Sequence, residues 1–234
     1  LINEYGADSL RFTLISMASP GRDVKLSKDR VTGNRNFITK IWSANNFLKL
    51  NNCKLDKKIN LTSIKLPINH WIYNEFIKTQ NLITKNIEIF RFDEAARYAY
   101  QFVWHSYCDW YLEFLKPIFN SKNKSEIKEA KAFSSFMMAN ILRILHPFIP
   151  FFTENLWSLN AYKKIFNNYL ISSSWPDFKI INKFSKNQND INDLIEIISN
   201  IRSTKAELKI TPKLYCDIFF DDKSGKLKKL VNKN

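Results

Sequence analysis

Residues 27–51 read SKDRVTGNRNFITKIWSANNFLKLN and carry a clear helical pattern. Ser27 is a good N-cap because its hydroxyl can accept a backbone N–H of the first turn, and Asp29 places a negative charge where the helix dipole favours one. Apolar residues recur on one side at spacings of three and four, namely Phe37, Ile41, Ala44 and Leu48. The opposite side carries Lys28, Arg35, Thr39, Trp42, Asn46 and Lys49. The pattern predicts an amphipathic helix with one buried and one solvent-facing side.

Similar patterns on either side of this segment predict further helices. Leu10, Leu14 and Met17 mark a short helix over 8–18, which Ser19-Pro20-Gly21 ends because proline cannot continue a helix. Residues 52–66 show no period and are interpreted as a linker. Later helices are expected from Pro67 to about 87, from an Asp93 N-cap to Pro117, and over about 125–146, 153–159 and 190–208, with a strand over 214–220. Consecutive amphipathic helices with short links predict a mainly α fold, an antiparallel helix bundle with a short α/β stretch at the C-terminus.

The composition fits this fold. The 234 residues can form one large helical domain or two small ones, and 45% of them are hydrophobic. Nineteen Phe, nine Tyr and six Trp predict a core packed with large rings. Four Gly and seven Pro are few for an all-β chain with many tight turns.

The formal net charge of +14 points to a polyanionic partner, and nucleic acid is the commonest one. The alternative is that the charge reflects coding bias, because Lys, Asn and Ile are abundant together, as in proteins of AT-rich genomes. The sign of the charge is therefore more informative than its size.

The spacing of the cysteines and the hydropathy of the chain indicate where in the cell the protein is expected. Cys53, Cys108 and Cys216 are far apart and have no zinc-knuckle spacing, which fits a reducing cytoplasm. No apolar run is long enough to span a bilayer, and we expect no signal peptide. The chain opens at Leu1 in mid-pattern, so we expect a fragment of a longer protein.

No catalytic centre is predicted. The sequence has no Gly-rich phosphate loop and no Gly-x-Ser-x-Gly elbow. Asp109 and Glu113 share a helix face and could act as an acid/base pair, but a salt-bridged face is the favoured interpretation. His146 stands at a helix end, where a cation favours the dipole, so a capping role is expected. His70 and His105 have no acidic or thiol partner at ligand spacing and are interpreted as structural.

The polar side of the 27–51 helix has a pattern typical of RNA recognition. Arg35 and Trp42 lie seven residues apart and are nearly eclipsed on a straight helix. A guanidinium beside an exposed indole can hydrogen-bond and stack on an unpaired base. The alternative is that Trp42 packs under a neighbouring helix and that Arg35 makes an ordinary surface ion pair.

Several motifs resemble one family of enzymes. Residues 5–11, YGADSLR, are similar to the GAD-x-LR segment of class I aminoacyl-tRNA synthetases for valine, isoleucine and leucine. Residues 19–27, SPGRDVKLS, and residues 33–44, GNRNFITKIWSA, resemble the valyl-tRNA synthetases in particular. The same family pattern is matched in order by FDEAA (92–96), CDWYLE (108–113), HPFIPF (146–151), SWP (174–176) and Ile201-Arg202 with Ala206-Glu207. The chain departs from it at Ser43, where Asn is usual, and at Asn46, where Arg is usual, which removes a charge and a forked donor.

The resemblance implies a function and a set of partners. The parent enzyme would join valine to its tRNA through a valyl-adenylate, using ATP and magnesium, and would hydrolyse mischarged threonine in an inserted editing domain. The HIGH and KMSKS motifs of ATP binding do not occur in this chain. We therefore expect an inactive C-terminal fragment that contains the anticodon-binding domain, binds no cofactor, and has valine tRNA and the parent's catalytic and editing domains as partners. It is expected to be monomeric and to have no membrane partner.

The expected domains are a linker and stem-contact region (1–27), the anticodon-binding bundle (28–180), and a C-terminal helix and strand (181–234). The expected tRNA-binding residues are Arg35, Asn36, Lys40, Trp42, Asn46 and Phe47. Helical geometry places Arg35, Trp42 and Asn46 on one face, whereas Lys40 and Phe47 lie on a flank and follow from the resemblance. Two alternatives stay open: the same domain of an isoleucyl- or leucyl-tRNA synthetase, and a helical scaffold domain with no RNA role.

Overall fold

The computed structural model describes residues 1–21, 23–56, 59–181 and 188–211, with the single positions 214, 215, 217 and 219. These residues form helices and loops, and no strand occurs among them, so the mainly α prediction is confirmed. The α-helices are α1 (Ile2–Tyr5), α2 (Ala7–Met17), α3 (Lys28–Leu50), α4 (Pro67–Glu88), α5 (Phe92–Gln101), α6 (Leu112–Phe119), α7 (Lys124–Leu145), α8 (Pro150–Leu159), α9 (Tyr162–Phe166) and α10 (Gln188–Glu207). A π-helix, η2 (Phe102–Tyr111), joins α5 to α6, and short 3-10 helices lie at Leu61–Ser63 (η1) and Leu170–Ser172 (η3).

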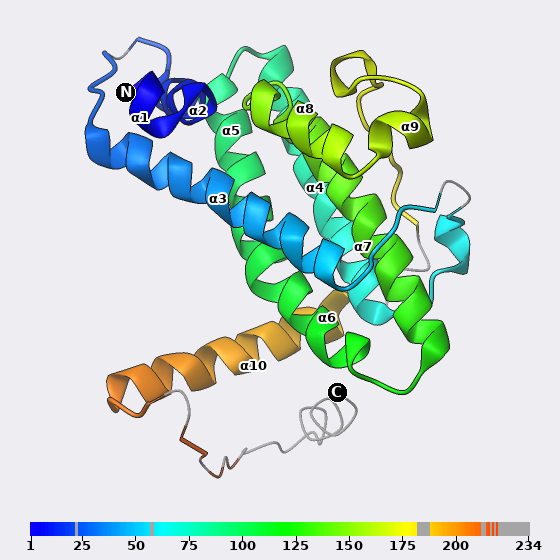
Figure 1. Cartoon of the computed structure of the whole chain (residues 1–234). Helices are drawn as coiled ribbons and strands as arrows, with labels where there is room; N and C mark the ends of the chain where they lie inside the picture. The colour runs from blue at the N-terminus through cyan, green and yellow to red at the C-terminus, as the bar shows by residue number, and fades with distance from the viewer. Residues whose placement is uncertain are drawn as a thin grey trace.

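The long helices form the antiparallel bundle that their short connections predict. Helix α4 runs upward in Figure 1, α5 to α6 runs down, and α7 returns upward, while α3 crosses in front of them. Helix α4 contacts α5, η2 and α7, and α3 contacts both η2 and α7. The crossing leaves one side of α3 facing away from the bundle.

Large rings fill the interior, as the composition predicts. Phe37 of α3 lies at the junction of several elements, with its ring centroid 5.2 Å from that of Phe12 and 4.7 Å from that of Tyr100. Each buried ring removes about 150–250 Å² from water, so these contacts contribute much of the stability of the bundle. The largest fully buried side chains are Trp157, Tyr73, Tyr107, Tyr111, Phe12, Phe37, Phe76 and Phe133, followed by isoleucines.

The run from α5 through α6 corrects two expectations about helix ends. It was expected to end at Pro117, yet α6 contains this proline and ends at Phe119. Proline removes one backbone hydrogen bond, but Ile118 and Phe119 pack against the core and hold the last turn in place. Asp93 was expected to be the N-cap of α5; the N-cap is Arg91, and no side chain caps the helix.

Other boundaries also differ from the predicted ones. Helix α7 begins at Lys124 because Asn123 caps it, and the Asn123 side chain accepts hydrogen bonds from the N–H groups of Ser125 and Glu126. Helix α8 begins at Pro150, three residues before the expected start, since proline suits the first turn of a helix. The expected linker over 52–66 contains η1 and the buried residues Ile64 and Leu66.

The expected C-terminal strand receives no support. Leu214, Tyr215, Asp217 and Phe219 are described and are not in a strand, and the other residues of 214–220 lie outside the described part of the chain. The preceding helix, α10, starts against α4, where the Trp71 indole donates a 2.8 Å hydrogen bond to the Asn192 side chain. Its later turns extend past the lower end of α6 (orange in Figure 1).

Candidate nucleic-acid interface

Helix α3 holds the predicted site residues, and its local sequence explains its position. The Ser27 hydroxyl accepts a hydrogen bond from the backbone N–H of Arg30, which caps the helix as predicted. Val31, Phe37, Ile41, Ala44 and Leu48 are buried against the bundle. Because these residues, together with the buried Asn45, fix the rotation of α3, most of the residues between them face outward or sideways.

The outer face of α3 consists of Arg35, Trp42 and Asn46. Arg35 is exposed, Asn46 is half-buried, and the Trp42 side chain keeps 39% of its surface in contact with solvent. Arg35 and Trp42 are about 10 Å apart along the axis, since an α-helix rises 1.5 Å per residue. Trp42 is therefore not buried under a neighbouring helix, and none of the described residues forms an ion pair with Arg35.

The flank of α3 that turns toward η2 and α6 is engaged within the protein. The Lys40 ammonium lies 2.9 Å from an Asp109 carboxylate oxygen and 4.9 Å from the centre of the Trp104 ring. The hydrogen bond to Asp109 raises the pKa of Lys40. The Phe47 ring packs on Phe119, with 5.9 Å between the ring centroids. Lys40 and Phe47 thus link α3 to the π-helix and to the last turn of α6, whereas Asn36 on the same flank is exposed.

Asp109 and Glu113 form a salt-bridged surface, which was the favoured alternative to an acid/base pair. Asp109 pairs with Lys40 and also lies 3.4 Å from Nδ1 of His105, so the expectation that His105 has no acidic partner is wrong. Glu113 pairs with Lys116 at 2.7 Å. The wider π-helical turn that brings Asp109 toward α3 was not indicated by any local sequence pattern.

Arg202 is a residue at this surface to which sequence reasoning assigned no role. Its guanidinium lies 5.0 Å from the centre of the Trp110 ring and so connects α10 to η2. A hollow of about 350 Å³ lies beside this contact and is also lined by Lys40, Asp109 and Glu113. The signal was present in the sequence, because Arg202 and Trp110 both lie in the quoted motifs.

Other motifs contact one another across long sequence distances. An Asp8 carboxylate oxygen accepts the backbone N–H of Phe152 at 2.6 Å, in the first turn of α8, and Arg11 donates to the Pro147 carbonyl oxygen. Burial raises the pKa of the Asp8 carboxyl, while the N–H groups of α8 oppose the shift. These contacts fasten the N-terminal helices to the start of α8.

Asp93 has a different role from the expected helix cap. Its side chain is only 6% exposed and accepts two hydrogen bonds from the Arg91 guanidinium, at 2.9 and 3.0 Å. The Ser19 hydroxyl donates to the second Asp93 oxygen at 2.8 Å. The Arg91 guanidinium, with help from Ser19, holds the pKa of the Asp93 carboxyl far below its usual range. Asp93 therefore ties the loop after α2 to the start of α5.

His146 occupies the predicted C-cap of α7 but is not a cationic cap. Its Nδ1 lies 2.8 Å from the Thr153 hydroxyl oxygen, which itself donates to the Ile149 carbonyl oxygen. Burial lowers the pKa of the His146 imidazole, which favours the neutral ring at pH 7. His70 is structural as predicted, since it is buried and its Nε2 lies 2.8 Å from the Ile64 carbonyl oxygen.

Among the described residues, no cluster of His, Cys, Asp or Glu could hold a metal ion. Burial raises the pKa of the Cys108 thiol to about 12, so this thiol stays protonated and is a poor nucleophile at neutral pH. None of the described helices has both the length and the apolar character that a membrane span requires.

Comparisons with known proteins give the geometry a context. Residues 69–220 match the family described as the anticodon-binding domain of tRNA ligase. The valine–tRNA ligase of Pelagibacter ubique (strain HTCC1062) is 47% identical over 234 residues, which are 100% of this chain and 26% of the relative. That of Brucella suis biovar 1 (strain 1330) is 43% identical over 211 residues, 90% of this chain and 23% of the relative. The chain therefore spans about a quarter of the length of these relatives, and α3 lies within the first of these alignments although it precedes the family match.

A solved structure has the same fold. It is the ternary complex of an Agrobacterium radiobacter K84 LeuRS with tRNA and LeuAMS, and its TM-score is 0.56 at 17% sequence identity. The similarity covers 78% of this chain and 21% of that one, and at this identity it shows the fold alone. The helix bundle and the family match over most of the chain lead to one conclusion: the chain belongs to the family of anticodon-binding domains of tRNA ligases.

Proposed function

We propose that this chain is the tRNA-reading part of a valine–tRNA ligase and that the outer face of α3 reads the unpaired bases of the anticodon. The observation that carries the proposal is the exposed face formed by Arg35, Trp42 and Asn46 on a helix that is otherwise packed into the bundle. The names of the relatives support valine as the amino acid.

The chemistry of this face suits single-stranded RNA. An indole offers a flat apolar surface, and stacking of a base on an aromatic ring contributes about 1–3 kcal/mol. A guanidinium can donate two parallel hydrogen bonds to a base edge, and an amide can both donate and accept. Arg35, Trp42 and Asn46 together therefore provide stacking, a fixed positive charge and a hydrogen-bonding group along one helix.

Lys40 and Phe47 act differently in this proposal. The Lys40 ammonium is already bound to Asp109, so a phosphate or base would have to compete with that carboxylate. Phe47 packs on Phe119 at the rim of a hollow of about 270 Å³, which Lys40 and Ser43 also line. We assign to Lys40 and Phe47 the role of holding the outer face in position. Asn36 lies on the same flank but is exposed, so it adds to the reading surface.

The remaining roles of the parent enzyme would lie in other parts of it. ATP and magnesium would bind in a catalytic domain with the HIGH and KMSKS motifs, and a separate domain would hydrolyse mischarged threonine. Residues 1–27 would link that catalytic core to the bundle of residues 28–180, and residues 181–234 would lead to further parts. The protein would act as a monomer in the cytoplasm, and this chain alone would show no valine-dependent ATP–pyrophosphate exchange.

The proposal is tested by binding of this chain to valine tRNA and to the same tRNA with an altered anticodon. We expect the altered tRNA to bind roughly 5- to 150-fold more weakly, since removing a well-formed pair of hydrogen bonds to a base costs roughly 1–3 kcal/mol by analogy with groove readout. Equal binding of the two tRNAs would contradict anticodon reading. Tighter binding of an isoleucine or leucine tRNA would contradict the assignment to valine.

A further inference from the structure

Four lysines line a hollow that lies outside the outer face of α3. Lys54 follows α3 in the chain, and Lys124, Lys128 and Lys131 come from one side of the first half of α7. They line a hollow of about 570 Å³ together with Leu55 and other residues of these two segments.

These four lysines are not paired with carboxylates among the described residues, whereas several other lysines of the bundle are. Lys40, Lys78 and Lys116 each form an ion pair of 2.7–2.9 Å, whereas no such pair occurs for the four lysines among the described residues. Asp56 is the acidic residue that lines the hollow. Glu129 of α7 points elsewhere, because its carboxylate accepts the backbone N–H groups of Lys65 and Leu66 ahead of α4. The hollow therefore carries a net positive charge.

Helix stability does not explain this arrangement. Lys124 is the first residue of α7 and Lys128 lies one turn later, so both charges sit near the positive end of the helix dipole. A cation in the first turn is unfavourable, typically by a few tenths of a kcal/mol. Like charges gathered in one place also repel each other, and this repulsion is relieved when a polyanion binds.

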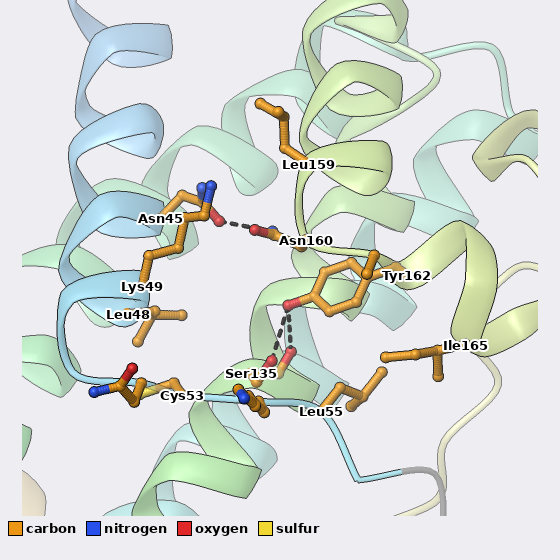
Figure 2. Close-up of a pocket in the computed structure, with 13 residues that line it drawn as sticks. Asn45, Leu48, Lys49, Cys53, Leu55, Ser135, Leu159, Asn160, Tyr162 and Ile165 are labelled. Carbon is orange, nitrogen blue, oxygen red and sulfur yellow. Dashed lines mark hydrogen bonds between the residues drawn. The ribbon is translucent and has the colours of Figure 1, made fainter.

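A second pocket connects the hollow to the end of α3, the helix that carries the proposed reading face. A neighbouring pocket of about 390 Å³ shares Asn52, Lys54 and Leu55 with it and is lined by Lys49 in the last turn of α3. Figure 2 shows this pocket, with Lys49 on one side and Leu55 on another. An RNA whose loop lies on α3 can therefore extend its backbone along Lys49 and Lys54 toward α7.

We propose that Lys54, Lys124, Lys128 and Lys131 form a second RNA-binding surface, which contacts the phosphodiester backbone without reading sequence. The inference rests on the proposed function, since it takes RNA as the polyanion. The ammonium group of lysine suits this role, because it is a point charge that binds phosphates from many directions.

The test compares two double variants of this chain that change the net charge equally. Lys124→Glu with Lys128→Glu alters the hollow, and Lys85→Glu with Lys179→Glu alters two exposed lysines outside both pockets. Binding of valine tRNA and of its anticodon variant is measured by fluorescence anisotropy from about 50 to 200 mM salt. Denaturation midpoints check that each variant folds, and the hollow variant should be at least as stable as the wild type.

We expect the hollow variant to bind both tRNAs about tenfold more weakly at low salt and with the same anticodon preference as the wild type. The plot of log affinity against log salt should become shallower by about 0.7–0.9 for each phosphate that the variant no longer neutralises. Binding and slope equal to those of the control variant would overturn the inference, and so would a changed anticodon preference. If the wild type shows no anticodon preference while the hollow variant still weakens binding, the proposed function fails and the phosphate surface holds.

Discussion

The outer face and the flank of α3 differ in what surrounds them, although both lie in the same stretch of family-like sequence. On the outer face, Arg35 and Trp42 extend into solvent. On the flank, Lys40 binds Asp109, and Phe47 packs on Phe119. Similarity of sequence alone does not distinguish the two sides, whereas their contacts leave one side open to a ligand and pack the other against η2 and α6.

The largest effect on stability is expected on the flank. Phe47→Ala removes a half-buried ring from its contact with Phe119 and should lower the free energy of unfolding by about 2–4 kcal/mol, somewhat less than for a fully buried ring. Trp42→Ala is the matched control on the outer face and should lower the free energy of unfolding by less, about 1 kcal/mol, because more of its side chain is exposed. Chemical denaturation of both variants measures the difference. Equal losses would mean that the two sides of α3 do not differ in the way described.

A second effect concerns Asp93, which stabilises the bundle away from α3. Asp93→Asn should lower the free energy of unfolding at pH 7 by about 1.5–3 kcal/mol, the usual contribution of hydrogen bonds to a charged group. Glu94→Ala, which changes a more exposed carboxylate of the same turn, is the control and should cost less. Neither variant should alter the anticodon preference, and a lost preference in folded Asp93→Asn would contradict a purely structural role.

The Asp93 effect should also depend on pH. Arg91 and Ser19 lower the pKa of the carboxyl in the folded state, so the stabilisation is fully present above the unfolded pKa of about 3.9. It is lost as the pH falls below that value toward the lower folded pKa. The stability difference between wild type and Asp93→Asn should therefore be constant from pH 7 to 5 and should shrink below pH 4. A difference that persists unchanged at pH 3 would mean that Asp93 is not held ionised in this way.

The smallest expected effect on stability belongs to the ion pair between Lys40 and Asp109. Both side chains are about one-third exposed, so a double-mutant cycle with Lys40→Met and Asp109→Asn should give a coupling of about 0.5–1 kcal/mol. The coupling should weaken in high salt, since solvent and ions screen exposed charges. A coupling of zero at low salt would contradict the positioning role proposed for Lys40.

Helical periodicity predicted most of the fold, and Ser27 correctly marked the start of α3. The spacing of Phe37, Ile41 and Leu48 predicted which side of α3 is buried, and the same spacing placed Arg35 and Trp42 outside. Such patterns work because each depends on neighbours within one helix.

The errors share a physical cause, which is contact over long sequence distances. Asp93 resembles an N-cap locally, but its partner Ser19 is 74 residues away. Pro117 is a helix breaker in isolation, yet the packing of Ile118 and Phe119 keeps its helix intact. The π-helical turn that brings Asp109 to Lys40 has no distinct composition, so no local rule predicts that ion pair.

The most direct test of the account is the anticodon preference of Arg35→Lys compared with that of Lys40→Arg. Each change keeps the charge and alters only the shape of the donor, and the two residues lie on different sides of α3. Binding of valine tRNA and of its anticodon variant is measured for wild type and for both proteins at one salt concentration. We expect Arg35→Lys to lose most of the preference, a factor of roughly 5–150, because lysine lacks the planar fork, while Lys40→Arg keeps it. Retention of the preference by Arg35→Lys, or its loss only in Lys40→Arg, would contradict the account.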